Sequence, residues 1–380
     1  MRDYGVRKAL LWSVAYVALA LVLGVAIGGC MRGKKGTQPL QGELEGADGV
    51  KMSLYVPFRR ELGAVDSAVL KDGRFKFTNG ELRGVYVFGI PKVGEWLVYL
   101  SETPTRMVFE EKDPLLAQPY GDTLNWLLRE NHLLVRDVGA KMQELSQEYA
   151  ASTVDGDKIP KAKLDALDVL WDRASSEFEG KITALISDNV ENPVGIFLLR
   201  QYKEMFTPEG LEELRGKVEA YAGAHAEDAN AAAMHTYLQW NTNLLVGAYA
   251  PSVSGVLVES GKEVSLDSLL KGERKVLVQF WSLGDEGSDS CVLALNGLVE
   301  KYGRGAFGVV GMCFAPTREE ASEYLTAHGV EWPNILVYSE ISEQYNVWGG
   351  AKNFLYGGDG RLLARDVTLN ELEERLGKAQ

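Results

Sequence analysis

The chain has 380 residues, of which 46% are hydrophobic and 24% charged, and its formal net charge is -13. This length suffices for two or three domains, and a composition near that of soluble globular proteins excludes both wholesale disorder and a protein that crosses a membrane many times. The acidic excess repels phosphate backbones and no basic stripe is interleaved with aromatic residues, so we expect no nucleic-acid partner.

The N-terminus has the layout of an export signal. An uncharged, mostly apolar run at residues 9–29 follows the basic pair Arg7 and Lys8 and ends directly before Cys30. The small residues Gly28 and Gly29 make this junction resemble the lipobox of bacterial signal peptides. The resemblance implies cleavage before Cys30 and attachment of lipid to its sulfur, and two or more acyl chains anchor a protein stably where one does not.

Two interpretations of this segment remain open. In the first, residues 1–30 are a signal peptide with a lipobox and residues 31–39 are a tether. In the second, the run at residues 9–29 stays uncleaved, because 21 apolar residues can span about 30 Å of hydrocarbon. Both predict an exported protein anchored in the membrane of the bacterial cell envelope and facing the periplasm, and the first makes the membrane a partner through lipidated Cys30.

Residues 40–112 carry short runs in which apolar and polar residues alternate, separated by glycine, aspartate and proline. This period of two is typical of strands in a small antiparallel β-domain. The runs are MSLYV, RFKFTN, VYVFGI, WLVYL and RMVFE.

Residues 113–246 change to helical spacing, which predicts a central segment of four or five helices. Asn192-Pro193 and Thr207-Pro208 each have the form of a capping residue followed by proline in the first helical position. Two stripes of apolar residues at this spacing are interpreted as packing surfaces. They are Leu124, Leu128, Leu134, Val138, Met142, Leu145 and Tyr149, and Leu164, Leu167, Trp171, Phe178, Ile182 and Leu185.

Residues 247–380 alternate buried strands with capped helices, which predicts an α/β sheet covered by helices. Thr317 with Glu320, and Thr368 with Glu371, form capping-box patterns before two of the helices. The predicted strands contain the runs VLVQFW, FGVVGMCF, NILVY, FLYGG and RLLARDV. The whole chain is therefore expected to be an α+β multidomain protein, with an antiparallel β-domain, a helical segment and an α/β domain in that order.

Several segments of the last third match one known pattern: Ala250-Pro251, the Gly261-Lys262 hairpin, VLVQFW, VEKYG, Val330-Glu331-Trp332-Pro333 and residues 345–363. By these segments residues 247–380 resemble the thioredoxin-like domains of the TlpA type, within the alkyl hydroperoxide reductase and thiol-specific antioxidant superfamily, and the resemblance implies a thioredoxin-like fold. More weakly, residues 40–112, with the run VDSAVLKDGRFKF, resemble the β-rich domain that precedes a helical segment and such a domain in lipoproteins of gut-type anaerobic bacteria.

The departures from this family concern its redox site. Family members read Phe-Trp-Ala-Ser-Trp-Cys-x-x-Cys after the first strand, and a gapless alignment on residues 280–288 puts Asp285 and Ser288 at the two cysteine positions. A shifted alignment, which places Ser288 and Cys291 in the motif, fits the following helix less well. The family's cis-proline corresponds to Ala351. Asp285 and Ser288 are both good helix-capping residues, which gives them a structural role as an alternative.

Cys291 is the remaining thiol near this motif. It is predicted about one turn into the helix, where the helix dipole lowers the pKa of a thiol. Asp285, Glu286 and Asp289 oppose formation of a thiolate there, and Cys313, in an apolar run, is interpreted as a buried hydrophobic residue. A disulfide between Cys291 and Cys313 is disfavoured because one lies in a helix and the other in a strand.

No other chemistry is indicated. The four histidines lie far apart without metal-site spacing, and no phosphate-binding or nucleophile motif is present, so we expect neither a metal nor a cofactor. The first functional hypothesis is an envelope-tethered lipoprotein whose redox-inactive thioredoxin-like domain has a binding or accessory role toward a protein or peptide. The alternative is a thiol-disulfide oxidoreductase that works through the single thiol of Cys291.

Overall fold

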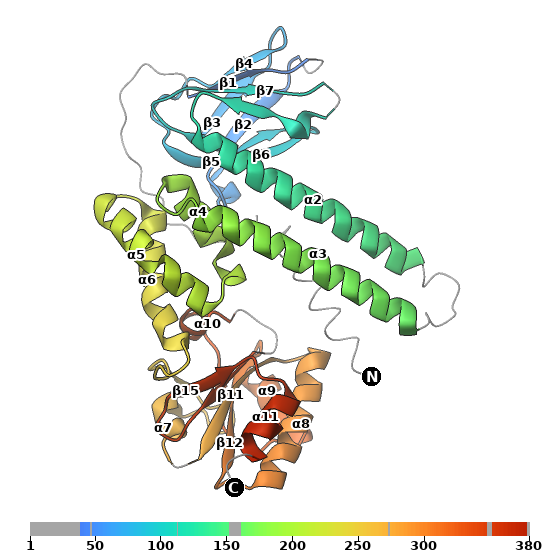
Figure 1. Cartoon of the computed structure of the whole chain (residues 1–380), viewed down its shortest axis with the longest axis vertical. Coiled ribbons are helices and arrows are strands. Elements are labelled where there is room, and N and C mark those ends of the chain that lie inside the picture. Colours follow the sequence, from blue (N-terminus) through green and yellow to red (C-terminus); the bar gives the residue numbers. More distant parts are fainter. Residues whose placement is uncertain are drawn as a thin grey trace. The chain divides into compact units, whose positions relative to one another are not determined.

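The structure, a computed structural model, describes residues 39–45, 48–111, 113–151, 161–272, 274–347 and 352–377 (Figure 1). The described residues form two compact units. The first, which we call the sheet-bearing unit, runs up to Phe206 and includes Leu214–His235. The second, the thioredoxin-like unit, comprises Thr207–Glu213 and the residues from Thr236 onward. The domain limits expected from the sequence divide the chain more finely and stay predictions.

Two four-stranded sheets begin the sheet-bearing unit and share one core of buried apolar side chains, among them Phe75, Phe88 and Trp96. The first sheet has the order β4 (Arg74–Lys76), β1 (Leu40–Glu43), β7 (Thr105–Val108) and β8 (Gln118–Tyr120). The second has the order β3 (Asp66–Val69), β2 (Lys51–Tyr55), β5 (Gly84–Ile90) and β6 (Gly94–Leu100). Each of the five alternating runs contains a strand.

The expectation of a wholly antiparallel β-domain is wrong at one pair of strands. Strands β1 and β7 run parallel, with Leu40 opposite Thr105 and Glu43 opposite Val108. About 60 residues of chain separate these strands, so no tight turn constrains their relative direction. Period-two patterning reports which face of a strand is buried and carries no information on strand direction.

Five α-helices follow among the described residues, and the first two pack along one another as a long hairpin (Figure 1). Asn192 caps α4 by accepting from the backbone nitrogens of Val194 and Gly195, with Pro193 as the first helical residue, as predicted. Thr207 accepts from Gly210 at the start of α5. The helices are α2 (Leu124–Ala151), α3 (Lys161–Ser187), α4 (Pro193–Tyr202), α5 (Pro208–Ala224) and α6 (Ala229–Asn241). Short 3-10 turns are η1 (Arg60–Leu62), η2 (Pro114–Leu116), η3 (Lys203–Met205) and η4 (Thr242–Leu244).

The thioredoxin-like unit contains a five-stranded sheet. Strands β11, β12 and β13 are parallel, and β14 and β15 form an antiparallel hairpin that pairs with β11. A parallel strand-helix-strand unit followed by such a hairpin is the order that the thioredoxin-like resemblance implies. The order across the sheet is β13 (Asn334–Leu336), β12 (Phe307–Phe314), β11 (Lys275–Ser282), β14 (Asn353–Tyr356) and β15 (Leu362–Arg365).

Helices cover both faces of this sheet (Figure 1). One face packs against α8 (Glu286–Tyr302), α9 (Arg318–Ala327) and α11 (Leu369–Gly377), and the other against α7 (Leu266–Leu270) and α10 (Ser339–Tyr345). The hydroxyls of Thr317 and Thr368 cap their helices by accepting from the backbone nitrogens of Glu320 and Glu371. At Thr368 the box is reciprocal, because its backbone nitrogen donates to the Glu371 carboxylate. A short hairpin of β9 (Ser254–Val256) and β10 (Glu263–Ser265) precedes α7.

The predicted export signal is not part of what the structure describes. The run at residues 9–29, Cys30 and the tether at residues 31–39, except its last residue, lie outside the described residues. Within the described residues, every helix is too short or too polar to cross a membrane. The anchor therefore stays a prediction from the sequence.

Candidate functional site

The candidate site is the loop between β11 and α8, where the family resemblance places its two cysteines. The chain leaves β11 at Ser282 and turns at Gly284, whose φ of 82° lies in the left-handed region. Asp285 follows as the N-cap of α8, and its side chain accepts from the backbone nitrogen of Ser288 at 2.8 Å. The helix begins at Glu286, so Cys291 lies further into it than the single turn expected from the sequence.

Ser288 is the third residue of α8 and is fully buried, and it is not the N-cap of this helix. Its Oγ donates to Asp285 Oδ2 at 2.9 Å and accepts from the backbone nitrogen of Ser282 at 3.1 Å. The two positions that carry the disulfide in the family therefore hold a carboxylate and a hydroxyl bonded to one another. Neither group can exchange a disulfide, and both satisfy polar groups of the turn.

Cys291 lies on α8 with its side chain partly buried against the core below that helix. Burial raises the pKa of its thiol to about 11. The sequence set a lowering of this pKa by the helix dipole against the opposing acidic residues, and burial decides the direction. Cys291 is six residues beyond the cap Asp285, outside the first turn where the dipole acts, so loss of solvation dominates.

Cys313 lies on β12 opposite Trp281 and has no exposed surface. Burial is the larger and the negative charge of Glu259 the smaller of the causes that raise the pKa of its thiol to about 12. Both Cys291 and Cys313 are free thiols, so no disulfide joins them. The interpretation of Cys313 as a buried hydrophobic residue agrees with this environment.

The third position singled out by the family resemblance is not described by the structure. Ala351, at the position of the family's cis-proline, lies outside the described residues. In the part of the chain that the structure describes, no three histidine, cysteine, aspartate or glutamate side chains gather in a way that could hold a metal ion.

A buried polar network next to the candidate site was not predicted from the sequence. Trp281 Nε1 donates to Asn334 Oδ1 at 3.1 Å, and Glu259 Oε1 accepts from the backbone nitrogen of Asn334 at 2.7 Å. Gly311 makes room for it, because a Cβ there would lie 1.9 Å from Asn334 Oδ1. The signal in the sequence was Gly311, the second glycine within the apolar run FGVVGMCF.

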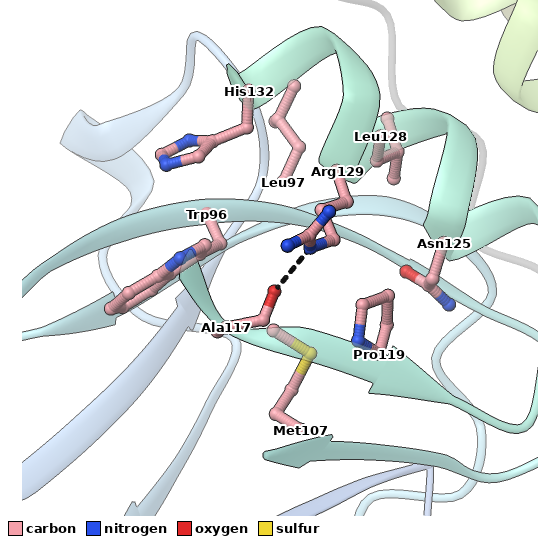
Figure 2. A pocket seen from close by; sticks show the side chains of 9 residues that line it. All are labelled: Trp96, Leu97, Met107, Ala117, Pro119, Asn125, Leu128, Arg129 and His132. Atoms are coloured by element: carbon pink, nitrogen blue, oxygen red, sulfur yellow. Dashed lines mark hydrogen bonds between the residues drawn. The ribbon is translucent and has the colours of Figure 1, made fainter. Parts of the chain in front are cut away.

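Helix α2 of the sheet-bearing unit docks on the strands through polar side chains that the sequence analysis also missed (Figure 2). Asn125, Arg129, His132 and Arg136 recur at spacings of four, three and four residues, so they share one face of α2, and we call them the docking stripe. Their partners lie on β6 and β7 and in the segment leading into β8. Asn125 bonds to the backbone of Tyr99 and the hydroxyl of Thr105, Arg129 to the carbonyls of Leu116 and Ala117, and Arg136 to Asp113.

Solved structures similar to the chain include a thiol-disulfide oxidoreductase and the thioredoxin domain of another. One, from Bacteroides vulgatus, is 21% identical over 35% of this chain and 96% of that one, with a TM-score of 0.32. Another, from Bacteroides fragilis, is 23% identical over 35% of this chain and 99% of that one, also with a TM-score of 0.32. A thiol:disulfide interchange protein of the thioredoxin family from Chlorobium tepidum is 21% identical over 36% and 97%, with a TM-score of 0.31. No protein-family model and no curated protein matches the sequence.

These superpositions cover about a third of the chain. The thioredoxin-like fold of that third is inferred from its own strand order, β13-β12-β11-β14-β15. The chain as a whole combines helices and sheets, as expected for the α+β class.

Proposed function

We propose that the chain is an envelope-tethered lipoprotein whose thioredoxin-like domain binds a protein or peptide without catalysing disulfide exchange. The observation that carries this proposal is the hydrogen-bonded pair of Asp285 and Ser288 at the positions of the family's cysteines. The burial and raised pKa of Cys291 also support it, because the thiolate is the form that attacks a disulfide.

Reduction of insulin by dithiothreitol, followed as turbidity with the purified full chain, tests the absence of catalysis. We expect the wild-type chain to stay at the uncatalysed rate. Turnover that Cys291→Ser abolishes would instead support the alternative, an oxidoreductase working through one thiol. Asp285→Cys combined with Ser288→Cys is the matched variant, since it restores both sulfurs to the same loop and reports whether the scaffold still supports exchange.

Attachment to the envelope is a separate part of the proposal, supported by the basic, apolar and small residues that precede Cys30. Mass spectrometry of the mature N-terminus should find residue 30 first and carrying lipid. A chain that retains residues 1–29 would replace the lipoprotein by an uncleaved anchor, and Cys30→Ser should prevent processing.

The partner is sought by crosslinking in intact envelopes, followed by purification of the chain. We expect a protein or peptide joined to the thioredoxin-like domain around the loop at residues 283–288. Crosslinks that map only to the sheet-bearing unit would contradict this part of the proposal.

A further inference from the structure

Of the four side chains in the docking stripe, His132 is the one whose charge changes between pH 5 and 8. With Trp96 it lines a cavity of about 10 Å³ between α2 and the strands, about the space of one water molecule (Figure 2). The centroids of the two rings are 6.5 Å apart. His132 thus lies where α2 meets β6, and a charge on its ring would act directly on that contact.

The unpartnered ring nitrogen of His132 suits a neutral ring. One ring nitrogen bonds to the backbone of Leu115, a bond that by itself favours the protonated form, while Nε2 is buried and has no hydrogen-bond partner among the described residues. A neutral imidazole leaves Nε2 as an acceptor that one water in the cavity can satisfy. Protonation would turn Nε2 into a charged donor without a protein acceptor, and such a group is costly in a buried place.

The charges around His132 disfavour a proton as well. On its own helix, Arg129 and Arg136 flank it, and among the described residues the one acidic group acting on it is Asp113, from the segment before η2. Asp113 is already engaged at 3.0 Å by Arg136. Strand β6 contributes the uncharged Trp96, and η2 contributes the backbone of Leu115. Burial, reinforced by Arg136 and Arg129, lowers the pKa of His132 below its ordinary value.

We propose that the junction between α2 and the strands is a pH-sensitive latch, which is closed while His132 is neutral and loosens when His132 binds a proton. The latch belongs to the sheet-bearing unit and does not depend on the function proposed for the thioredoxin-like domain. A histidine whose pKa is lowered in the folded state adds stability above its unfolded pKa of about 6.5. That stability is lost as the pH falls through the window between the unfolded and the folded pKa.

Hydrogen exchange of the full chain, measured by mass spectrometry at pH 7.5, 6.5 and 5.5 and corrected for intrinsic exchange, tests the latch. We expect peptides within residues 113–136 to lose protection below pH 6.5, by up to about tenfold for each pH unit. His132→Gln removes the titration and keeps a polar side chain, so the acid effect should disappear from these peptides. His225→Gln is the control, because His225 is in the same unit with its side chain 48% exposed.

The proposal is overturned if the wild-type chain shows no acid-dependent loss of protection in these peptides, or if His132→Gln shows the same loss. Should His132→Gln fail to fold, the wild-type protein still decides the matter. Its four imidazoles can be titrated by NMR, with His132 assigned by elimination after substitution of His225, His235 and His328. Proton uptake by His132 and the loss of protection must then share one midpoint, and two different midpoints contradict the latch.

Discussion

One carboxylate oxygen of Asp285 accepts both the backbone N–H and the hydroxyl of Ser288, at 2.8 and 2.9 Å. A single side chain therefore caps α8 and also fixes the buried hydroxyl, which in turn accepts from the backbone of Ser282. The loop is held by oxygen and nitrogen groups at positions where the family resemblance implies sulfur. The ordered conformation of this loop therefore does not require a disulfide.

Removal of this cap should destabilise the protein. We expect Asp285→Ala to lower the free energy of unfolding by about 0.5–2 kcal/mol, because the N–H of Ser288 loses its acceptor at the start of the helix. Asp285→Asn keeps an acceptor oxygen and should cost less. Denaturant unfolding of the full chain measures both, and a more stable Asp285→Ala chain would indicate that Asp285 is retained for function at a cost in stability.

The thiols should be poorly reactive in the folded state. In a Cys30→Ser background, Cys291 and Cys313 are the remaining cysteines. With a pKa of about 11, roughly one Cys291 side chain in a thousand is a thiolate at pH 8. We expect labelling by Ellman's reagent to be about a hundredfold slower before than after denaturation. Fast labelling of the folded chain that Cys291→Ser removes would show that this thiol is accessible and activated.

Asn125 should be the most sensitive polar position of the docking stripe. It is 2% exposed and makes three hydrogen bonds to β6 and β7. Because Asn125→Ala leaves buried groups without partners, we expect a loss of about 2–3 kcal/mol in the free energy of unfolding. Glu130→Ala, on an exposed position of the same helix, should change it by less than about 0.5 kcal/mol. Equal effects would mean that the stripe contributes nothing beyond helix propensity.

A methyl group at Gly311 should break the network below the candidate site. Its carbon would lie 1.9 Å from Asn334 Oδ1 and 3.0 Å from Trp281 Nε1, so the bond between those side chains cannot survive. We expect Gly311→Ala to cost about 1–3 kcal/mol, with a shift in tryptophan fluorescence. Gly308→Ala is the control on the same strand, since its new carbon meets only the end of the flexible Arg274 side chain.

Features that depend on neighbours within a few residues could be predicted from the sequence. The caps at Asn192 and Thr317 form as expected, because their acceptors lie two or three residues from the donors. The run at residues 307–314 is strand β12 from end to end, because a continuous apolar segment fits a strand covered on both faces. Such features follow from the types of residues that lie close together in the sequence.

Features that depend on distant residues could not be predicted in this way. The parallel pairing of β1 with β7, and the approach of Trp281 to Asn334, join segments more than 50 residues apart. The raised pKa of Cys291 follows from the core that closes over it, which its position in the helix did not reveal. The sequence by itself determined the elements, their caps and the residue types at the positions where the family resemblance places two cysteines. Only the tertiary structure decided what those elements bury, because burial sets the cost of a charge or an unpaired polar group and is a property of the packed chain.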